Sequence, residues 1–246
     1  KNPEIKAYVS AFSPGAPSAA KTKTAPASNA APLFAPLLSP PLIGTDEAGK
    51  GDYFGPLCVA AVYADESQYQ KLLTAGVKDS KKLTDETMKK MEGEIRAICP
   101  ASSVVAIGPE KFNAMYQKAG NINALLGWAH GQAIKNVLEQ TACKNVLTDR
   151  YGSLHWLENQ LKGLELHLVQ EPKAEQNAAV AAASILARCA FVKGVRAMEK
   201  SYGFSFPLGA SSFVDDAGRR FVSQRGDQEL GKVAKISFKN TDKIIK

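Results

Sequence analysis

The stretch that decides the fold is Ile43-Gly-Thr-Asp-Glu-Ala-Gly-Lys-Gly-Asp-Tyr-Phe-Gly-Pro-Leu57. It begins as an apolar strand, closes with the acids Asp46 and Glu47, and continues into a turn with three glycines. Adjacent strand residues point to opposite faces, so both carboxylates reach one site only if the strand breaks there, which glycines permit. The alternative is a polar strand end in which Asp46 starts the turn and Glu47 is solvated. A second strand, Leu57–Ala64, follows the turn, and so short a connection predicts antiparallel pairing.

After Pro41, short β-branched runs alternate with longer segments whose apolar spacing is typical of helices. The expected strands are Leu42–Asp46, Leu57–Ala64, Ser103–Gly108, Asn145–Asp149 and Leu164–Gln170. The expected helices are Glu86–Ile98, Glu110–Lys118, Ile122–Thr141, Leu154–Leu161, Asn177–Lys200 and Ala217–Gln224. Later strands, separated by helices, are expected to add in parallel. The pattern predicts an α/β fold with a mixed five-stranded sheet flanked by helices.

Two further acids lie at positions where α/β folds often have functional residues. Asp149 follows an apolar strand at its carboxyl end, the edge at which open α/β sheets place functional groups. Alternatively, Asp149 caps a helix that begins near Ser153. Glu175 lies just ahead of a long apolar helix, where the helix dipole alone also favours an acid.

Together these four acids suggest chemistry with a hard cation. Mg²⁺ and Mn²⁺ prefer oxygen ligands, and the sequence offers no cluster of Cys or His. Two such ions, about 3.5–4 Å apart, can activate a water and stabilise the leaving oxygen when a phosphodiester is cleaved. That mechanism needs no histidine base. We therefore interpret His130, His155 and His167, which show no ligand spacing, as structural or surface residues.

Charge and composition separate two regions and indicate a partner. Lys and Arg number 31 against 24 Asp and Glu, and the net charge of +7 makes an anionic partner plausible. Residues 1–41 hold eight of the 13 prolines. Such a Pro/Ala-rich segment buries too little apolar surface to offset its ordering entropy, so we expect an extended linker there.

The cysteines and the apolar runs bear on the cellular setting. The four cysteines form no C-x-x-C pair and are expected to be reduced core thiols in a cytoplasmic protein. The longest apolar run, Ala178–Ala187, is too short to cross a bilayer, so no membrane helix is expected. Nothing in the pattern indicates an obligate protein partner, and a monomer is expected.

Several motifs, taken in order, resemble the type 2 and type 3 ribonuclease H group from about Leu42 to the C-terminus. They are GTDEAGKGDYFGPL, KDSKKL at Lys78–Leu83, VLTD ending at Asp149, KAE, and AAASILAR ending at Arg188. The resemblance implies a ribonuclease H-like fold with a helical C-terminal extension. It also implies endonucleolytic hydrolysis of the RNA strand of RNA·DNA hybrids with Mg²⁺ or Mn²⁺, leaving 5′-phosphate and 3′-hydroxyl ends. Carried over by position, the catalytic and metal-binding tetrad is Asp46, Glu47, Asp149 and Glu175.

Details within the motifs favour type 3. Lys50 stands between two glycines where type 2 enzymes usually have Arg, and Glu175 stands where they have Asp. Type 2 enzymes also carry a Gly-Tyr-Pro-Thr element whose tyrosine helps to recognise an RNA-to-DNA junction, whereas this chain has Gly209-Ala-Ser-Ser212. We therefore expect cleavage within stretches of hybrid. The alternatives are a type 2 enzyme that cuts at single ribonucleotides and a hybrid-binding module without catalysis.

Several residues fit as contacts with the hybrid, with a solvated turn as the alternative for Ser80 and Lys81. These are Gly49, Lys50 and Gly51 in the turn, Ser80 and Lys81 in a polar loop, and Ser184 in the long helix. Type 3 enzymes typically carry an N-terminal substrate-binding domain that resembles the TATA-binding protein fold. Residues 1–41 are accordingly expected to be a linker or a remnant of that domain, and residues 42–246 the catalytic domain.

Overall fold

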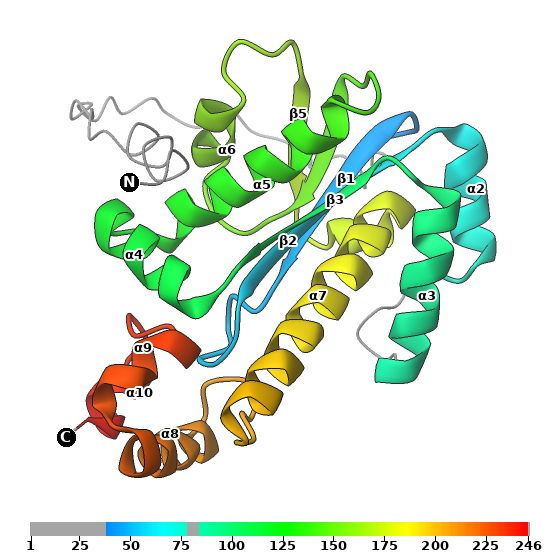
Figure 1. The fold of residues 1–246 in the computed structure, drawn as a ribbon. Coiled ribbons are helices and arrows are strands. Elements are labelled where there is room, and N and C mark those ends of the chain that lie inside the picture. Colours follow the sequence, from blue (N-terminus) through cyan, green and yellow to red (C-terminus); the bar gives the residue numbers. More distant parts are fainter. Residues whose placement is uncertain (1–37, 78–83, 246) are drawn as a thin grey trace, which may run out of the picture. The chain divides into compact units, whose positions relative to one another are not determined.

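A mixed five-stranded sheet lies at the centre of the computed structural model, which describes residues 38–77 and 84–245 (Figure 1). The strands are β1 (Leu42–Ala48), β2 (Leu57–Ala64), β3 (Ser102–Ile107), β4 (Asn145–Asp149) and β5 (His167–Glu171). Their order across the sheet is β3-β2-β1-β4-β5. The central strand β1 pairs antiparallel with β2 and parallel with β4, which confirms the mixed sheet. Apart from its last four residues, the expected linker 1–41 lies outside the described residues.

The expected direction of one strand is wrong. β3 follows helices in the chain, yet it pairs antiparallel with β2, with Leu57 opposite Ile107. Two helices, α2 (Glu66–Thr74) and α3 (Asp85–Ile98), connect these strands. The chain therefore enters β3 at the end of the sheet where it left β2. Elsewhere the expectation is confirmed, since β5 adds in parallel to β4.

Helices cover both faces of the sheet (Figure 1). One face carries α7 (Ala178–Tyr202) with α2 and α3, and the other carries α4 (Pro109–Ala119), α5 (Ile122–Leu138) and α6 (His155–Gln160). Side chains at the N-caps set several helix starts, among them Thr84, Asn121 and Asn177, each of which accepts a hydrogen bond from a backbone N–H of the first turn. The helix α2 was missed by the apolar spacing, although Asp65 and Gln68 form a capping box at its start.

The close contact between β1 and α7 depends on Gly44. A Cβ at this position would lie 2.3 Å from backbone atoms of Ala179 and Val180. The strand is thus pressed against α7 on one face, while α5 packs on the other. Because side chains alternate along a strand, Asp46 shares the α7 face with Gly44, and Glu47 faces α5.

The helix α7 is long and apolar enough to cross a membrane when only length and composition are considered. The apolar run Ala178–Ala187 alone did not indicate a helix of this length. However, 67% of its most apolar 18-residue window is buried inside the protein. Its apolar character is that of a helix enclosed by a sheet and by neighbouring helices.

The C-terminal module, residues 205–245, contains α8 (Ser212–Arg225), the 3₁₀ turn η3 (Asp227–Glu229), α9 (Leu230–Val233) and α10 (Asn240–Ile244). It packs on the turn between β1 and β2 and on α7 through an aromatic cluster that includes Tyr53, Phe54, Phe191, Phe206 and Phe221. The helical C-terminal extension is therefore confirmed.

One buried lysine joins this module to the turn. The Lys235 Nζ donates hydrogen bonds to the carbonyl oxygens of Asp52 and Gly55, both at 2.7 Å. Its backbone N–H donates to the Tyr53 carbonyl at 2.9 Å. Burial lowers the pKa of the Lys235 amine to about 8. The turn that follows the two acids is thus held by a residue about 180 positions later in the chain.

Substitution of Gly44 by alanine tests the contact between β1 and α7. We expect Gly44→Ala to lower the free energy of unfolding by about 1–3 kcal/mol or more, because its Cβ meets backbone atoms that cannot swing aside. Gly93→Ala is the matched control, since Gly93 lies exposed within α3 with open space around it. That change should stabilise the protein by about 0.5–1 kcal/mol. Urea denaturation measures both, and equal effects would contradict the account.

Candidate active site

The carboxyl ends of β1 and β4 bring two of the acids together. These strands are parallel and Thr45 lies opposite Thr148, so Asp46 and Asp149 follow side by side at one edge of the sheet. The charge of Asp149 is one of the factors that raise the pKa of Asp46, which places the two carboxylates within electrostatic range. The neighbours expected from the sequence are therefore neighbours in the structure.

Asp46 is the most perturbed acid of this edge. Burial raises its pKa from 3.8 to about 7, with further contributions from the charges of Glu47 and Asp149. Two hydrogen bonds partly oppose this shift: the Glu47 backbone N–H donates to Oδ1 at 2.8 Å, and the Ser184 side chain reaches the carboxyl from α7. Ser184 is thus brought to the site, whereas the Arg188 guanidinium, four residues on, lies over the Phe191 ring at 5.2 Å.

Asp149 is held by the segment that carries Glu175. Its Oδ1 accepts a hydrogen bond from the backbone N–H of Ala174 at 3.1 Å, in the 3₁₀ turn η2 (Ala174–Gln176). The alternative that Asp149 caps the helix near Ser153 is wrong, since α6 begins without a side-chain cap. Glu175 is half-buried in η2, just ahead of α7, as expected from the sequence.

Glu47 lies on the other face of the strand. The strand does not break at the two acids, because β1 continues to Ala48 and keeps its pairing with Cys58. Burial alone would raise the pKa of Glu47, but contacts with His130 and Lys50 outweigh it and lower this pKa. The Lys50 Nζ lies 3.5 Å from Oε1, and the His130 Nε2 lies 3.3 Å from Oε2.

His130 is the residue that sequence reasoning missed. Its imidazole is fully buried, contacts the Thr45 hydroxyl through Nδ1, and stacks on the Tyr151 ring with centroids 4.5 Å apart. A structural role for His130 agrees with its burial. That interpretation did not include the contact between His130 and Glu47. No local signal reveals that contact, since His130 and Glu47 meet only when α5 packs on β1.

The glycine turn presents Lys50 at the edge of the sheet. Gly49 has a φ of 84°, and a Cβ there would lie 2.2 Å from the Pro56 carbonyl oxygen, so the turn requires glycine. Around Gly51 the space is open. The Lys50 Nζ donates to the Tyr151 carbonyl oxygen at 3.0 Å. Lys50 also borders a cavity of about 320 Å³ whose other lining residues include Tyr116, Phe238 and Lys239.

Two of the predicted contacts with the hybrid cannot be placed. Ser80 and Lys81 lie outside the described residues. The four cysteines are free, and three of them are buried, as expected of core thiols.

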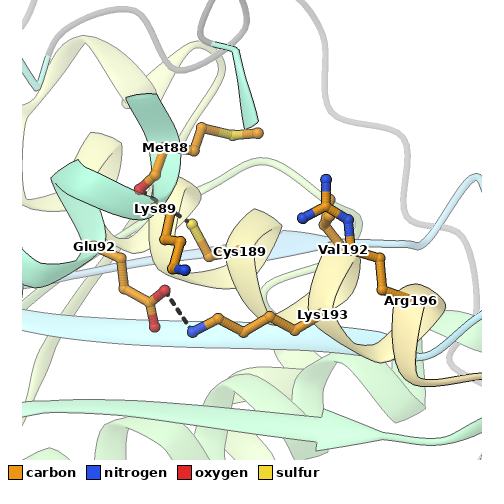
Figure 2. Close-up of a pocket in the computed structure, with 7 residues that line it drawn as sticks. All are labelled: Met88, Lys89, Glu92, Cys189, Val192, Lys193 and Arg196. Carbon is orange, nitrogen blue, oxygen red and sulfur yellow. Dashed lines mark hydrogen bonds and ion pairs between the residues drawn. The ribbon is translucent and has the colours of Figure 1, made fainter. Parts of the chain in front are cut away.

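A cavity of about 150 Å³ between α3 and α7 is separate from the acidic edge (Figure 2). None of the four predicted acids lines it, and its one carboxylate, Glu92, pairs with Lys193 at 2.7 Å. The Cys189 thiol donates to the Met88 carbonyl, and burial raises its pKa to about 11, which disfavours the reactive thiolate.

The donor chemistry of the acidic edge fits a hard divalent cation. Within residues 38–77 and 84–245, no three His, Cys, Asp or Glu side chains already converge closely enough to hold a metal ion. The available groups are nevertheless carboxylates, the ligands that such cations prefer. The buried Asp46 is also disfavoured as an anion by Glu47 and Asp149, and a bound cation would relieve that repulsion.

The chain is similar to known proteins in sequence and in structure. The sequence model of a family described as Ribonuclease HII matches residues 43–241. Ribonuclease HIII of Protochlamydia amoebophila is 40% identical over 207 residues, which cover 83% of this chain and 68% of the relative. The Chlamydia pneumoniae ribonuclease HIII is 41% identical over 209 residues, with coverages of 83% and 70%.

A solved structure, Bst-RNase HIII in complex with Mn²⁺, resembles the chain with a TM-score of 0.76 and 31% identity, over 83% of this chain and 68% of that one. The order of the motifs, the fold, the acidic edge and these relatives lead to one conclusion. The chain belongs to the ribonuclease HII family and, within it, to the type 3 ribonuclease H enzymes.

Proposed function

We propose that this protein is an endoribonuclease that hydrolyses the RNA strand of RNA·DNA hybrids by two-metal-ion catalysis and leaves 5′-phosphate and 3′-hydroxyl ends. The observation that carries the proposal is the position of Asp46, a buried carboxyl that lies beside Asp149 at the carboxyl edge of the sheet, where burial and then the charges of neighbouring acids raise its pKa to about 7. A carboxyl in that setting gains more from a divalent cation than an exposed one does.

The four acids are proposed to bind the metal ions. Asp46 is proposed to contact both ions, with Glu47, Asp149 and Glu175 completing the set of ligands. Bound Mg²⁺ or Mn²⁺ supplies activation of the attacking water and stabilisation of the leaving oxygen. The chain itself orients these ligands: Ser184 holds the Asp46 carboxyl, and the Ala174 N–H holds that of Asp149.

The turn is proposed to hold the hybrid backbone. Gly49 and Gly51 let the backbone N–H groups approach the sugar-phosphate chain, and Lys50 supplies a positive charge beside the acids. The neighbouring cavity adds Lys239 and the Tyr116 ring. We also propose Ser80 and Lys81 of the polar loop, and Ser184 of α7, as contacts with the hybrid.

Substrate choice follows from the segment beside the turn. The Gly209 N–H donates to Asp52 Oδ1 at 2.7 Å, which pins this segment to the turn. The next residue, Ala210, is exposed and has no ring to stack at an RNA-to-DNA junction. We therefore propose cleavage within continuous hybrid rather than at single ribonucleotides. We further propose that the protein acts as a cytoplasmic monomer.

Loss of Asp149 tests the acidic site. We expect Asp149→Asn to lower the rate of hybrid cleavage by at least about 100-fold, because it removes a negative ligand while its remaining carbonyl oxygen still accepts from Ala174. Gel assays would compare a continuous hybrid with a DNA duplex that contains one ribonucleotide, in Mg²⁺ and in Mn²⁺. Glu86→Gln, an exposed acid on α3, should leave the rate unchanged. Absence of cleavage of either duplex by the unmodified protein would contradict the proposal.

The pKa of Asp46 predicts how metal binding depends on pH. Its folded pKa is raised from 3.8 to about 7, so the stability that it contributes is present below pH 4 and is lost as the pH rises to 7. Mn²⁺ requires the deprotonated carboxyl, so its affinity should fall about tenfold per pH unit below 7. The increase in Tm caused by Mn²⁺ should therefore be larger at pH 8 than at pH 6. In Asp46→Asn most of this pH dependence should vanish, and an unchanged profile would argue against Asp46 as a ligand.

Removal of the Lys50 charge tests the contact with the phosphate backbone. We expect Lys50→Ala to weaken hybrid binding and to reduce the slope of log K against log salt by about one, the change for one lost phosphate contact. Fluorescence anisotropy with a labelled hybrid in Ca²⁺ would measure the slope. Lys118→Ala, an exposed lysine of α4, should leave both affinity and slope unchanged. An unchanged slope in Lys50→Ala would remove this lysine from the interface.

A further inference from the structure

We infer that His130 is the residue that positions the Glu47 carboxylate for metal binding, an inference that rests on the proposed two-metal function. Its starting point is the alternation along β1. Asp46 shares the α7 face of the strand with Ser184, whereas Glu47 leaves the strand toward α5. To serve the same site as Asp46, the Glu47 carboxylate must be held at the strand end rather than turned into the layer between β1 and α5.

Two side chains set the direction of that carboxylate. The Lys50 Nζ lies 3.5 Å from Oε1 and the His130 Nε2 lies 3.3 Å from Oε2. The side chains of Lys50 and His130 differ in their freedom to move. The Lys50 side chain is 36% exposed on a turn, and substrate phosphate competes with Glu47 for its charge. The His130 side chain is 0% exposed, so substrate cannot reach it.

The imidazole of His130 is fixed in position and in plane. Its Nδ1 contacts the hydroxyl of Thr45, which belongs to the same strand as Glu47. Its ring is nearly parallel to that of Tyr151, at an angle of 9° and a centroid distance of 4.5 Å. The buried Nε2 has no hydrogen-bond partner among the described residues, and the charged group beside it is the Glu47 carboxylate, at 3.3 Å. A carboxylate only accepts hydrogen bonds, so we assign the proton to Nε2 and leave Nδ1 to accept from the Thr45 hydroxyl.

This arrangement is the one by which proteins orient carboxylate ligands of metals. A group that donates to one carboxylate oxygen fixes the rotamer and leaves the other oxygen for the cation, and loss of such a group typically weakens metal binding about 10- to 100-fold. When substrate draws Lys50 to a phosphate, Oε1 of Glu47 becomes available while His130 still holds Oε2. His130 therefore acts through Glu47 and does not touch the reacting atoms.

Three substitutions separate positioning from packing. His130→Gln places an N–H donor close to the position of Nε2, His130→Asn retains a polar group only near Nδ1, and His130→Leu fills the space alone. The primary readout is the affinity of the metal-free protein for Mn²⁺, measured by calorimetry in the absence of nucleic acid. Tm is measured for each variant, and kcat and KM are measured with a continuous hybrid. Ile134→Ala, a buried change one turn further along α5, is the matched control for lost packing.

We expect His130→Asn and His130→Leu to weaken Mn²⁺ binding about tenfold or more and to lower kcat with little change in KM, while His130→Gln stays within about threefold of the unmodified protein. Ile134→Ala should lower Tm without changing the Mn²⁺ affinity. Thr45→Val, which removes the contact to Nδ1, should weaken Mn²⁺ binding in the same direction as His130→Asn.

The inference is overturned if the Mn²⁺ affinity follows Tm across all the variants, Ile134→Ala included, or if the Gln and Asn variants bind Mn²⁺ equally. If the unmodified protein binds Mn²⁺ but does not cleave hybrid, the proposed function fails, and the Gln-against-Asn comparison still decides the role of His130.

Discussion

The strand β1 is enclosed between α7 and α5, and the arrangement of the site follows from this enclosure. Gly44 lets the backbone of α7 approach until no side chain fits between them. The pleat then assigns successive residues to opposite layers, so that Asp46 meets Ser184 of α7 and Glu47 meets His130 of α5. Two adjacent carboxylates consequently have different environments. One has a raised pKa and the other a lowered pKa, although they share a peptide bond.

The difference between these environments is consistent with the metal site proposed above. Glu47 is held ionised by His130 and Lys50 before any metal arrives. Asp46 is opposed by its neighbours and exchanges a proton in the neutral pH range. One carboxylate is therefore a permanent charge and the other is a charge that the cation itself stabilises. A net positive chain that carries this small acidic edge attracts an anionic polymer overall and a cation locally.

Much of this was readable from the sequence because it depends on local patterns. Alternating apolar runs located β2 and β4 to the residue, and the acids at the ends of β1 and β4 pointed to the edge where they meet. The direction of β3 was not readable, because the local pattern of a strand does not give its direction and because α2, which buries only Leu72, was not expected from the apolar spacing. The partners of Glu47 were not readable either. His130 is 83 residues away, and its contact arises only from the packing of α5 on β1.

The hydrogen bonds between the C-terminal module and the glycine turn join segments that are synthesised at very different times. The carbonyl groups of Asp52 and Gly55 receive their hydrogen bonds from Lys235, and Gly55 and Tyr53 pair with backbone groups of Val233 and Lys235. A ribosome makes the turn first and these partners about 180 residues afterwards. During most of synthesis the acidic strand therefore exists without the scaffold that shapes its neighbouring turn. A nascent chain of this protein therefore completes the support of its glycine turn last, after all five strands of the described sheet have been synthesised.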